Sequence, residues 1–396
     1  MTKDKEKRMT PEIRFKGFSD DWEQRKWDRI VDRITTQSND STLPKVEFED
    51  IVSGEGRLNK DVSSKFDDRK GIIFAPDQIL FGKLRPYLQN WLLADFKGIA
   101  LGDFWVFDTN KHSSLFVYYL MQSTKYQTIA NLSSGTKMPR SDWKTVSQTE
   151  FSIPKDRAEE YQIGILFENL DSLITLHQQK YELLIKLKKA YLQLIFPKTG
   201  ESTPKVRFAD FHDNWEQRKL NEISDIYDGT HQTPKYQDEG VMFLSVENIK
   251  TLISNKFISH EAFESEFRIR PQRGDVLITR IGDVGTANVV ETDENLAYYV
   301  SLALLKSEKL KPYFLQSSIQ SPFVQKQIWK RTLHIAFPKK INKNEIGQVP
   351  INIPTTDEQV EIGTFFKHLD DAITLHQQKI ASLKSLKQAY LQKMFV

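Results

Sequence analysis

The heptapeptide ITLHQQK occurs twice in this chain of 396 residues, at positions 174–180 and again at 373–379. Around each copy the match continues into the tetrapeptide AYLQ, at 190–193 and 389–392, with the same shift of 373 − 174 = 199 positions. Segments that match in register over this length are expected to fold alike. The chain therefore contains a duplication, and its fold must place the two copies in equivalent surroundings.

A second repeat lies upstream in each half of the chain. WEQRK stands at 22–26 and at 215–219, a shift of 215 − 22 = 193 positions. Between the two markers, the segments of roughly 27–155 and 220–355 show no comparable match. The sequence thus predicts a duplicated frame that holds two unlike inserts. The difference of 199 − 193 = 6 residues is absorbed in the second insert and its junction.

The ITLHQQK copies lie in segments predicted to be long helices. Each segment opens with a capping residue and a Glu three positions later, Asp156 and Glu159 in the first and Thr355 and Glu358 in the second. Neither segment contains a further Pro before residue 197 or the end of the chain. At 1.5 Å per residue, a helix from residue 159 to 196 would be about 57 Å long.

Apolar residues recur through both helices in alternating steps of three and four, as in a coiled-coil seam. The seam positions expected to pack, or to dock a partner, are Ile174, His177, Leu184 and Tyr191 in the first helix and Ile373, His376, Leu383 and Tyr390 in the second. A helix of this length cannot bury its stripe on one small domain, so we expect the two helices to pair with each other. An antiparallel pair would give the frame an internal pseudo-twofold symmetry.

His177 and His376 interrupt the seam at equivalent positions. A metal pair or a pH switch is one interpretation, and a polar residue that fixes the helix register is the other. The register interpretation is favoured because no acidic or His neighbour at i+3 or i+4 completes a set of metal ligands.

The composition narrows the class of protein. Hydrophobic residues make up 39% and charged residues 28%, which is typical of a soluble globular chain. The absence of cysteine excludes disulfides, thiol catalysis and Cys-based zinc sites. The first fifteen residues are charged where a signal peptide needs an apolar run, and the longest apolar stretches are too short to span a bilayer. We therefore expect a cytoplasmic protein. Its net charge of +3 is too small to indicate nucleic-acid binding by itself.

Both inserts are predicted to be mixed α/β domains with short strands and many turns. In the second, strands are expected at 241–246, 275–280 and 299–305, followed by helices near 311–331. The predicted fold class is α+β: two mixed α/β domains joined by two long antiparallel helices that form a coiled-coil spacer. The predicted boundaries are an N-terminal segment at 1–26, a first domain at 27–155, a central helix at 156–197, a linker with the second WEQRK at 198–219, a second domain at 220–355 and a C-terminal helix at 356–396.

Each insert carries a loop of small and basic residues shortly before its long helix. The loop is SSGTKMPRSDW at 133–143 in the first insert and KRTLHIAFPKKIN at 330–342 in the second. Lys and Arg beside small polar residues suit contacts to phosphates and to base edges, although a loop of this kind can also be no more than a solvated surface. Its recurrence at the same place in both inserts favours a binding role.

Three further segments add candidates for nucleic-acid contact. DGTHQTPKY at 228–236 holds compact donors and acceptors on a loop bounded by Gly and Pro, and such a loop could also simply turn a corner. FGKLRPY at 81–87 and TRIGDVG at 279–285 place basic residues at strand ends. The candidate DNA-binding residues are Lys83, Arg85, Lys137, Arg140, His231, Thr233, Tyr236, Arg280, Lys339 and Lys340.

Motifs of the enzymes that act on nucleic acids are missing. The chain contains no Pro-Pro pair, which the Asn/Asp/Ser-Pro-Pro-aromatic motif of amino-group methyltransferases requires. It has no Gly-x₄-Gly-Lys-Ser/Thr phosphate loop and no HxxxH-type cluster among its eight histidines. No catalytic residue and no metal ligand is therefore predicted.

Taken together, these segments resemble the DNA-sequence specificity subunit of type I restriction–modification systems over essentially the whole chain. The resemblance rests on the WEQRK segments, on SIP and NIP at 152–154 and 352–354, and on the helices LITLHQQK…AYLQLIF and AITLHQQK…AYLQKMF. It also rests on GTKMPRSDW in the first insert and on DGTHQTPKY, FLSVENIK and RGDVLITRIGDVGT in the second. Each motif alone is weak, whereas the combination is highly specific.

The resemblance implies two target-recognition domains, each of which reads one half of a bipartite, asymmetric DNA sequence. It implies that the two long helices set the unread spacer and dock two modification (methyltransferase) subunits, with restriction (translocase/nuclease) subunits in the full complex. The chain itself would be non-catalytic and would carry no cofactor. S-adenosylmethionine, Mg and ATP would be bound by the partner subunits, which methylate adenine N6 or cleave DNA. The alternative is a two-headed protein-interaction scaffold that does not bind DNA.

Overall fold

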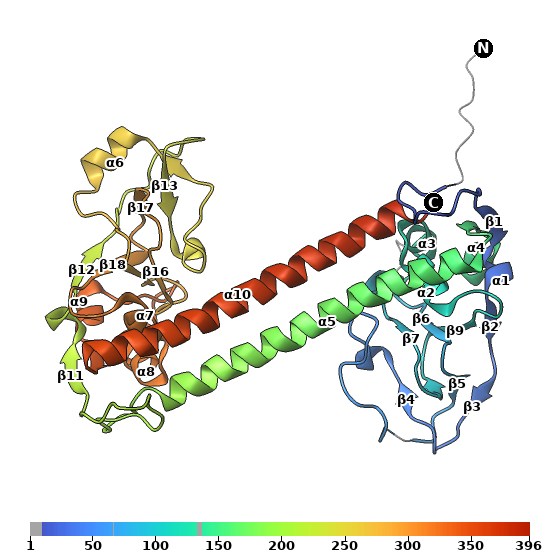
Figure 1. The fold of residues 1–396 in the computed structure, drawn as a ribbon, viewed down its shortest axis with the longest axis horizontal. Coiled ribbons are helices and arrows are strands. Elements are labelled where there is room, and N and C mark those ends of the chain that lie inside the picture. Colours follow the sequence, from blue (N-terminus) through green and yellow to red (C-terminus); the bar gives the residue numbers. More distant parts are fainter. Residues whose placement is uncertain (1–9, 66, 133–136) are drawn as a thin grey trace, which may run out of the picture. The chain divides into compact units, whose positions relative to one another are not determined.

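The computed structural model describes residues 10–65, 67–132 and 137–396. The chain divides into two compact units: the first contains the residues up to Gln178 together with Gln377–Val396, and the second contains Gln179–His376. Each unit holds one of the two inserts and part of both long helices, α5 (Arg157–Leu194) and α10 (Thr356–Lys393), which can be followed in Figure 1. The predicted fold class of two mixed α/β domains with two long helices is confirmed.

In the first unit, the insert folds into two small sheets with short helices. One sheet is antiparallel and has the order β2 (Asp32–Ile34), β9 (Phe104–Asp108), β6 (Ile79–Gly82), β7 (Trp91–Leu93). The other has the order β3 (Gln37–Ser38), β5 (Gly71–Phe74), β8 (Gly98–Ala100), β4 (Lys45–Val46), and its last pair is parallel. The helices are α1 (Trp27–Ile30), α2 (Ser114–Gln122), α3 (Thr124–Ala130) and α4 (Trp143–Gln148).

The insert of the second unit repeats the strand order of the first antiparallel sheet and differs in the other sheet. A four-stranded antiparallel sheet has the order β12 (Asp225–Asp228), β18 (Leu302–Lys306), β15 (Val276–Thr279), β16 (Ala287–Val289). A three-stranded sheet has the order β14 (Phe257–Ile258), β13 (Val241–Leu244), β17 (Leu296–Tyr298), and its last pair is parallel. The helices are α6 (His260–Glu266), α7 (Pro312–Gln320), α8 (Pro322–Arg331) and α9 (Lys343–Gly347).

The WEQRK repeat closes each insert. In the first unit β1 (Glu23–Lys26) pairs antiparallel with β10 (Glu150–Ile153), and in the second β11 (Glu216–Lys219) pairs with β19 (Pro350–Ile353). The first residue of each insert is thereby hydrogen-bonded next to its last residues. This arrangement lets inserts of different sequence and length be held by the same two strands.

An arginine just before each WEQRK segment fixes the start of the long helix. Arg14 binds Glu159 through two hydrogen bonds of 2.6 and 2.8 Å, and Arg207 binds Glu358 through two of 2.7 Å. Both glutamates are almost completely buried, so each carboxylate depends on its arginine for charge compensation. The two pairs are related by the shifts of the repeats, since 207 − 14 = 193 and 358 − 159 = 199.

A phenylalanine two residues beyond the end of each long helix packs into the aromatic core at the start of the other long helix. In the second unit, the Phe196 ring lies 5.9 Å from those of both Phe314 and Phe366. In the first unit, the Phe395 ring lies 5.6 Å from Phe116 and 5.8 Å from Phe167. The two long helices therefore run antiparallel in both units, as the sequence predicts. No helix of the described ranges has an apolar stretch long enough to cross a membrane.

Glycines permit a close helix crossing at the start of each long helix. A Cβ atom added at Gly164 would lie 2.7 Å from the Leu115 Cβ, and one added at Gly363 would lie 2.9 Å from the Phe314 backbone nitrogen. These distances are too short for non-bonded atoms. Both glycines are therefore required for α2 and α7 to pack against α5 and α10.

We expect Gly363→Ala to lower the free energy of unfolding by about 1 kcal/mol or more, because the added methyl group overpacks the contact with α7. Helix propensity alone predicts the opposite sign, a gain of about 1 kcal/mol. Urea unfolding of the full chain measures the difference. The matched control is Thr364→Ala, at an exposed neighbouring position of the same helix, which should be neutral or slightly stabilising. A stabilised Gly363→Ala variant would contradict the close crossing.

Candidate nucleic-acid interface

The basic loop of the first insert is joined to the end of strand β6. The Arg85 amide donates to the Pro139 carbonyl over 2.7 Å, and the Ser141 amide donates to the Lys83 carbonyl over 2.8 Å. Leu84 and Arg140 form the bridge between the two segments. Two of the segments selected from the sequence, at 81–87 and 133–143, are thus brought together, although residues 133–136 lie outside the described residues.

The second insert repeats this arrangement with a different sequence. The Gly282 amide donates to the Lys339 carbonyl over 2.8 Å, and the Ile341 amide donates to the Arg280 carbonyl over 2.9 Å. Here Ile281 and Lys340 form the bridge. The two basic loops therefore occupy equivalent places in the two units, each beside the strand end that also carries basic residues.

The cations of the first loop surround one carboxylate. The Arg140 guanidinium lies 3.0 Å and the Lys83 ammonium 3.5 Å from Asp103. Arg85 and Lys137 are exposed, and Arg85 has a left-handed backbone with φ of 51°. Asp103 can hold Lys83 and Arg140 in place until a stronger anion, such as a phosphate, replaces it.

In the second unit, Arg280 is a structural link rather than an exposed cation. Its guanidinium binds the Asp228 carboxylate and donates to the Ile341 carbonyl over 3.3 Å, while its side chain is only 11% exposed. Burial lowers the pKa of Arg280, and the adjoining carboxylate favours its charged form. This side chain therefore holds together the loop at 228–236 and the basic loop, and the contact of Arg280 with DNA stays a prediction.

The loop at 228–236 is fastened at both ends and exposed between them. Its start is held by the Thr230 amide, which donates to the Tyr298 carbonyl over 3.1 Å, and its end by the Gln237 amide, which donates to the Phe257 carbonyl over 2.9 Å. His231 and Thr233 are exposed along it. The Tyr236 ring packs edge-on against Phe243 at 5.7 Å and is capped by the Lys256 ammonium.

The comparisons with known proteins agree with this duplicated arrangement. The model of the type I restriction modification DNA specificity domain matches the chain twice, at residues 20–186 and 212–385. The chain belongs to the type I restriction–modification specificity subunits. These are the non-catalytic, DNA-binding subunits of such systems.

Individual relatives are distant in sequence. The chain is 22% identical over 292 residues to the specificity subunit of the type I restriction enzyme MjaVIII of Methanocaldococcus jannaschii, covering 69% of this chain and 67% of that one. It is 22% identical over 313 residues to the EcoBI specificity subunit of Escherichia coli, covering 72% and 66%. The crystal structure of the S subunit from M. genitalium has the same fold, with a TM-score of 0.69 at 15% identity over 98% of this chain and 99% of that one.

The predicted seam residues of this specificity subunit lie on the covered sides of the long helices. Ile174 and Ile373 are buried, and the six other seam positions are partly buried: His177, Leu184, Tyr191, His376, Leu383 and Tyr390. Tyr191 packs edge-on against Phe365 at 5.0 Å. Within residues 10–65, 67–132 and 137–396, no group of three or more His, Asp or Glu side chains is placed to hold a metal ion.

Ion pairs at equivalent positions flank the seam. Lys387 lies 2.7 Å from Asp171 in the first unit, and Lys188 lies 2.5 Å from Asp370 in the second. All four residues belong to the repeat, with Asp171 matching Asp370 and Lys188 matching Lys387. In the first unit the Tyr119 hydroxyl also donates to Asp171 over 2.9 Å, and burial together with that carboxylate raises the pKa of Tyr119. These contacts fix the register of the helix pair.

Each insert is further tied to the long helices by a carboxylate. Glu55 accepts hydrogen bonds from Gln178 of α5 over 2.9 Å and from Lys384 of α10 over 3.1 Å. In the second unit, Glu291 accepts a hydrogen bond from Tyr313 over 2.5 Å and lies 3.5 Å from Lys367 of α10. The position of each insert on its part of the helices is thus set by polar contacts as well as by the shared cores.

Sequence reasoning missed two apolar residues within the basic loop of the second unit. Ile335 and Phe337 are 99% and 103% exposed. The loop was selected for its lysines, and the same letters, HIAFPKK, also contain the signal for the missed residues. An isoleucine and a phenylalanine two residues apart in a loop without strand or helix periodicity have no regular element to turn them toward the core.

We expect Arg280→Ala to lower the free energy of unfolding by about 2 kcal/mol, because Asp228 loses its closest partner and the Ile341 carbonyl loses a donor. Urea unfolding of the full chain measures the loss. The control is Lys340→Ala, whose exposed side chain should change stability by less than about 0.5 kcal/mol. Equal, small effects of the two changes would show that Arg280 does not hold the loops together.

Proposed function

We propose that this specificity subunit reads a bipartite, asymmetric DNA target, one half with each insert, and directs adenine-N6 methylation or cleavage by partner subunits. The observation that carries the proposal is the equivalence of the two basic loops. Hydrogen bonds of the same pattern hold them at the same place in two inserts of unlike sequence. To read two different half-sites, the two loops must lie at equivalent places and carry different side chains.

In this scheme the cations of the loops and of the adjoining strand end bind phosphates and position the duplex. Lys83, Arg85, Lys137 and Arg140 serve in the first unit, and Lys339 and Lys340 in the second. Phosphate contacts supply affinity without sequence information, so base readout must come from neighbouring polar side chains. His231, Thr233 and Tyr236 are the candidates for that role in the second unit.

The long helices provide the surface for the modification subunits. Leucines stand exposed along α5 in the described structure: Leu173, Leu176, Leu183 and Leu187 are 44%, 45%, 64% and 38% exposed. On α10, the matching positions Leu375 and Leu386 are 53% and 40% exposed. Apolar side chains that remain exposed at helical spacing, beside a seam that is already occupied, favour a further helical partner.

The chemistry is assigned to those partners. Two modification subunits would bind S-adenosylmethionine and methylate the adenine, and restriction subunits would use Mg and ATP to translocate and cleave DNA. In this proposal the specificity subunit holds no cofactor, acts in the cytoplasm, and contributes the choice of sequence. The long helices would set the number of unread base pairs between the two halves of the target.

Substituting Lys137 or Lys339 by Ala should weaken binding to any duplex and should make the slope of log affinity against log salt shallower by about 0.9 for each phosphate that the variant no longer neutralises. Fluorescence anisotropy with random duplex DNA at graded salt, with and without modification subunits, measures both effects. The controls are Lys70→Ala in the first insert and Lys250→Ala in the second, both exposed lysines outside these loops. If the wild type shows no salt-dependent affinity, the chain is a protein-interaction scaffold and the proposal fails.

Substitutions at two adjacent leucines test the docking of modification subunits separately from the pairing of the long helices. Leu183 is exposed, whereas Leu184 is a partly buried seam residue. Leu183→Glu should leave the unfolding of the chain unchanged and weaken association with modification subunits by about tenfold or more, the value of one buried leucine. Leu184→Glu should destabilise the helix pair itself. Titration calorimetry with modification subunits and thermal unfolding measure the two effects, and a docking-neutral Leu183→Glu would contradict the proposed surface.

A further inference from the structure

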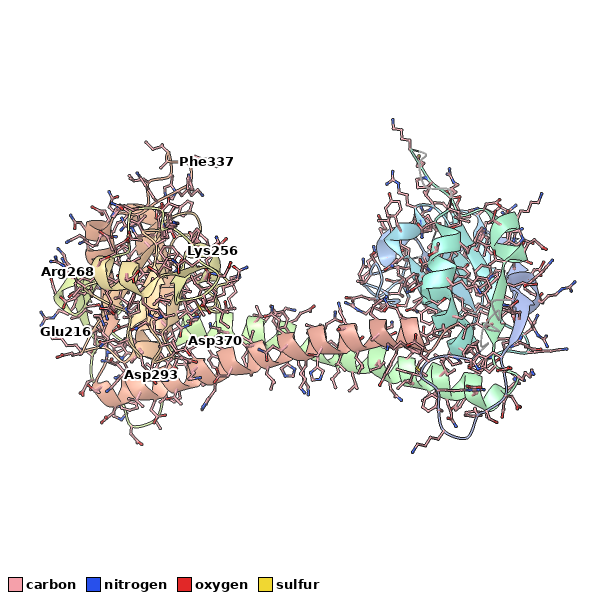
Figure 2. The ribbon with its side chains drawn as sticks, turned by 90° about the horizontal axis from the view of Figure 1, so that it is seen from above. Glu216, Lys256, Arg268, Asp293, Phe337 and Asp370 are labelled. Carbon is pink, nitrogen blue, oxygen red and sulfur yellow. The ribbon has the colours of Figure 1, made fainter. Side chains whose placement is uncertain are left out.

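The tip of the basic loop in the second unit presents two apolar side chains to solvent. Figure 2 shows Phe337 on a loop that projects from the body of this unit. Its side chain is 103% exposed and that of Ile335 is 99% exposed, so both faces of the Phe337 ring are uncovered. Exposure of this kind costs solubility, and a cluster of exposed apolar residues generally marks an interaction site.

The base of this loop is held in place, although its tip is uncovered. The Leu333 amide donates to the Lys340 carbonyl over 2.7 Å, which joins the two sides of the loop. The His334 ring lies 3.9 Å from that of Trp329, and its Nε2 atom lies 2.8 Å from the Trp329 carbonyl oxygen. The Lys339 ammonium covers the Trp329 ring at 4.9 Å. A fixed base reduces the entropy lost when the tip binds.

The tip lies in a segment of the chain that is rich in basic residues, one of which, Lys343, lies 3.8 Å from the Asp228 carboxylate of another segment. Between Glu308 and Glu345 there is no carboxylate, and this segment contains eight Lys or Arg residues, at positions 309, 311, 326, 330, 331, 339, 340 and 343. Lys339 and Lys340 lie within the loop, Lys330 lies in the last turn of α8, and all three are exposed. The partner of an apolar tip in a cationic setting must combine an anionic surface with an apolar interior. Duplex DNA has this combination, with phosphates outside and stacked bases inside.

We propose that Phe337, supported by Ile335, is a wedge that inserts between neighbouring base pairs in the half of the target bound by the second unit. This inference rests on the proposed function. Insertion would unstack one base step and bend the duplex, while Lys339 and Lys340 hold the flanking phosphates. A contact with a thymine methyl group would require only an edge of the ring, whereas a ring with both faces uncovered can be stacked on both sides.

The aromatic ring belongs to the second unit, since in the described part of the first loop Lys137 is followed by Met138, which is 47% exposed but not aromatic. Because the Lys339 and Pro139 carbonyls accept equivalent hydrogen bonds, Phe337 corresponds to Lys137 in the first unit. The first loop thus carries a cation at the position where the second carries an aromatic ring. A wedge also selects sequence without a hydrogen bond, because pyrimidine–purine steps unstack more easily than others. Binding should therefore distort one half of the target and leave the other half stacked.

The experiment uses the full chain, alone and with its modification subunits, and a duplex that carries the target identified from methylated positions of the host genome. 2-Aminopurine replaces single purines across both halves, excluding the adenines that are methylated. We expect a several-fold rise in fluorescence at adjoining positions of one half only. Donor and acceptor dyes at the duplex ends should report a bend of about 20–90°.

Phe337→Ala should abolish the fluorescence rise and the bend, and should lower affinity for the target about 5- to 150-fold, the range expected when one base–aromatic stacking interaction is removed. Affinity for random duplex should stay unchanged. Phe337→Leu, which keeps an apolar wedge, should retain part of the bend. The matched control is Ile253→Ala, which removes a 67% exposed apolar side chain from the same insert and should change none of these quantities.

The outcomes separate the wedge from the function on which it rests. If Phe337→Ala binds and bends the target like the wild type while Lys339→Ala weakens binding to every duplex, the wedge is overturned and DNA recognition stands. If Phe337→Ala instead loses modification subunits at unchanged DNA affinity, the tip is a protein contact and the wedge is again overturned. If the wild type has no affinity for DNA in either form, both proposals fail together. Because the side chain is exposed, thermal unfolding should be the same for all variants.

Discussion

Each half of this specificity subunit depends on the packing of one long helix's end against the other helix's beginning. Phe196 closes the aromatic core of the second unit, and Phe395 closes that of the first. Both side chains are at least 90% buried, and removing one from water stabilises the fold by about 2–3 kcal/mol. Neither insert therefore has a complete core without a residue from the helix that follows the other insert. The duplication is a requirement of the fold and not only a trace of its origin.

Because the long helices complete both cores, the chain has a constant frame and two inserts that can differ in sequence. The strand pairs β1–β10 and β11–β19 close each insert on itself, and the Arg14–Glu159 and Arg207–Glu358 pairs fix the start of each helix. All these elements lie at the boundary of an insert and none inside it. An insert can consequently change part of its fold without disturbing the frame, as the different strand orders of the sheets that contain β5 and β13 demonstrate.

The parts of the fold that repeat were predictable from the sequence, because the two copies of each repeated segment can be compared with each other. The long helices, their antiparallel pairing and the strands at 241–244 and 276–279 follow from periodicity and turn residues. The recurrence of the basic loop in both inserts was also visible, whereas its pairing with the strand ends emerged only from the fold. The role of Arg280 was likewise not visible, since its partner Asp228 lies 52 positions away in sequence and only the folded chain brings them together.

Phe337 was missed for a different reason. Sequence reasoning assigns an apolar residue to the core by default, and only the exposed surface of the folded loop reveals that this one is uncovered. The lysines and arginines that the two loops share describe what any DNA surface needs, so they explain attachment to a duplex but cannot explain a difference between two half-sites. The two half-sites must be told apart by positions that are equivalent in the two loops but differ in chemistry. In the hydrogen-bonded part of these loops, the largest such difference is between Lys137 in the first unit and the exposed ring of Phe337 in the second. An asymmetric target is therefore the natural consequence of a symmetric frame that carries one wedge.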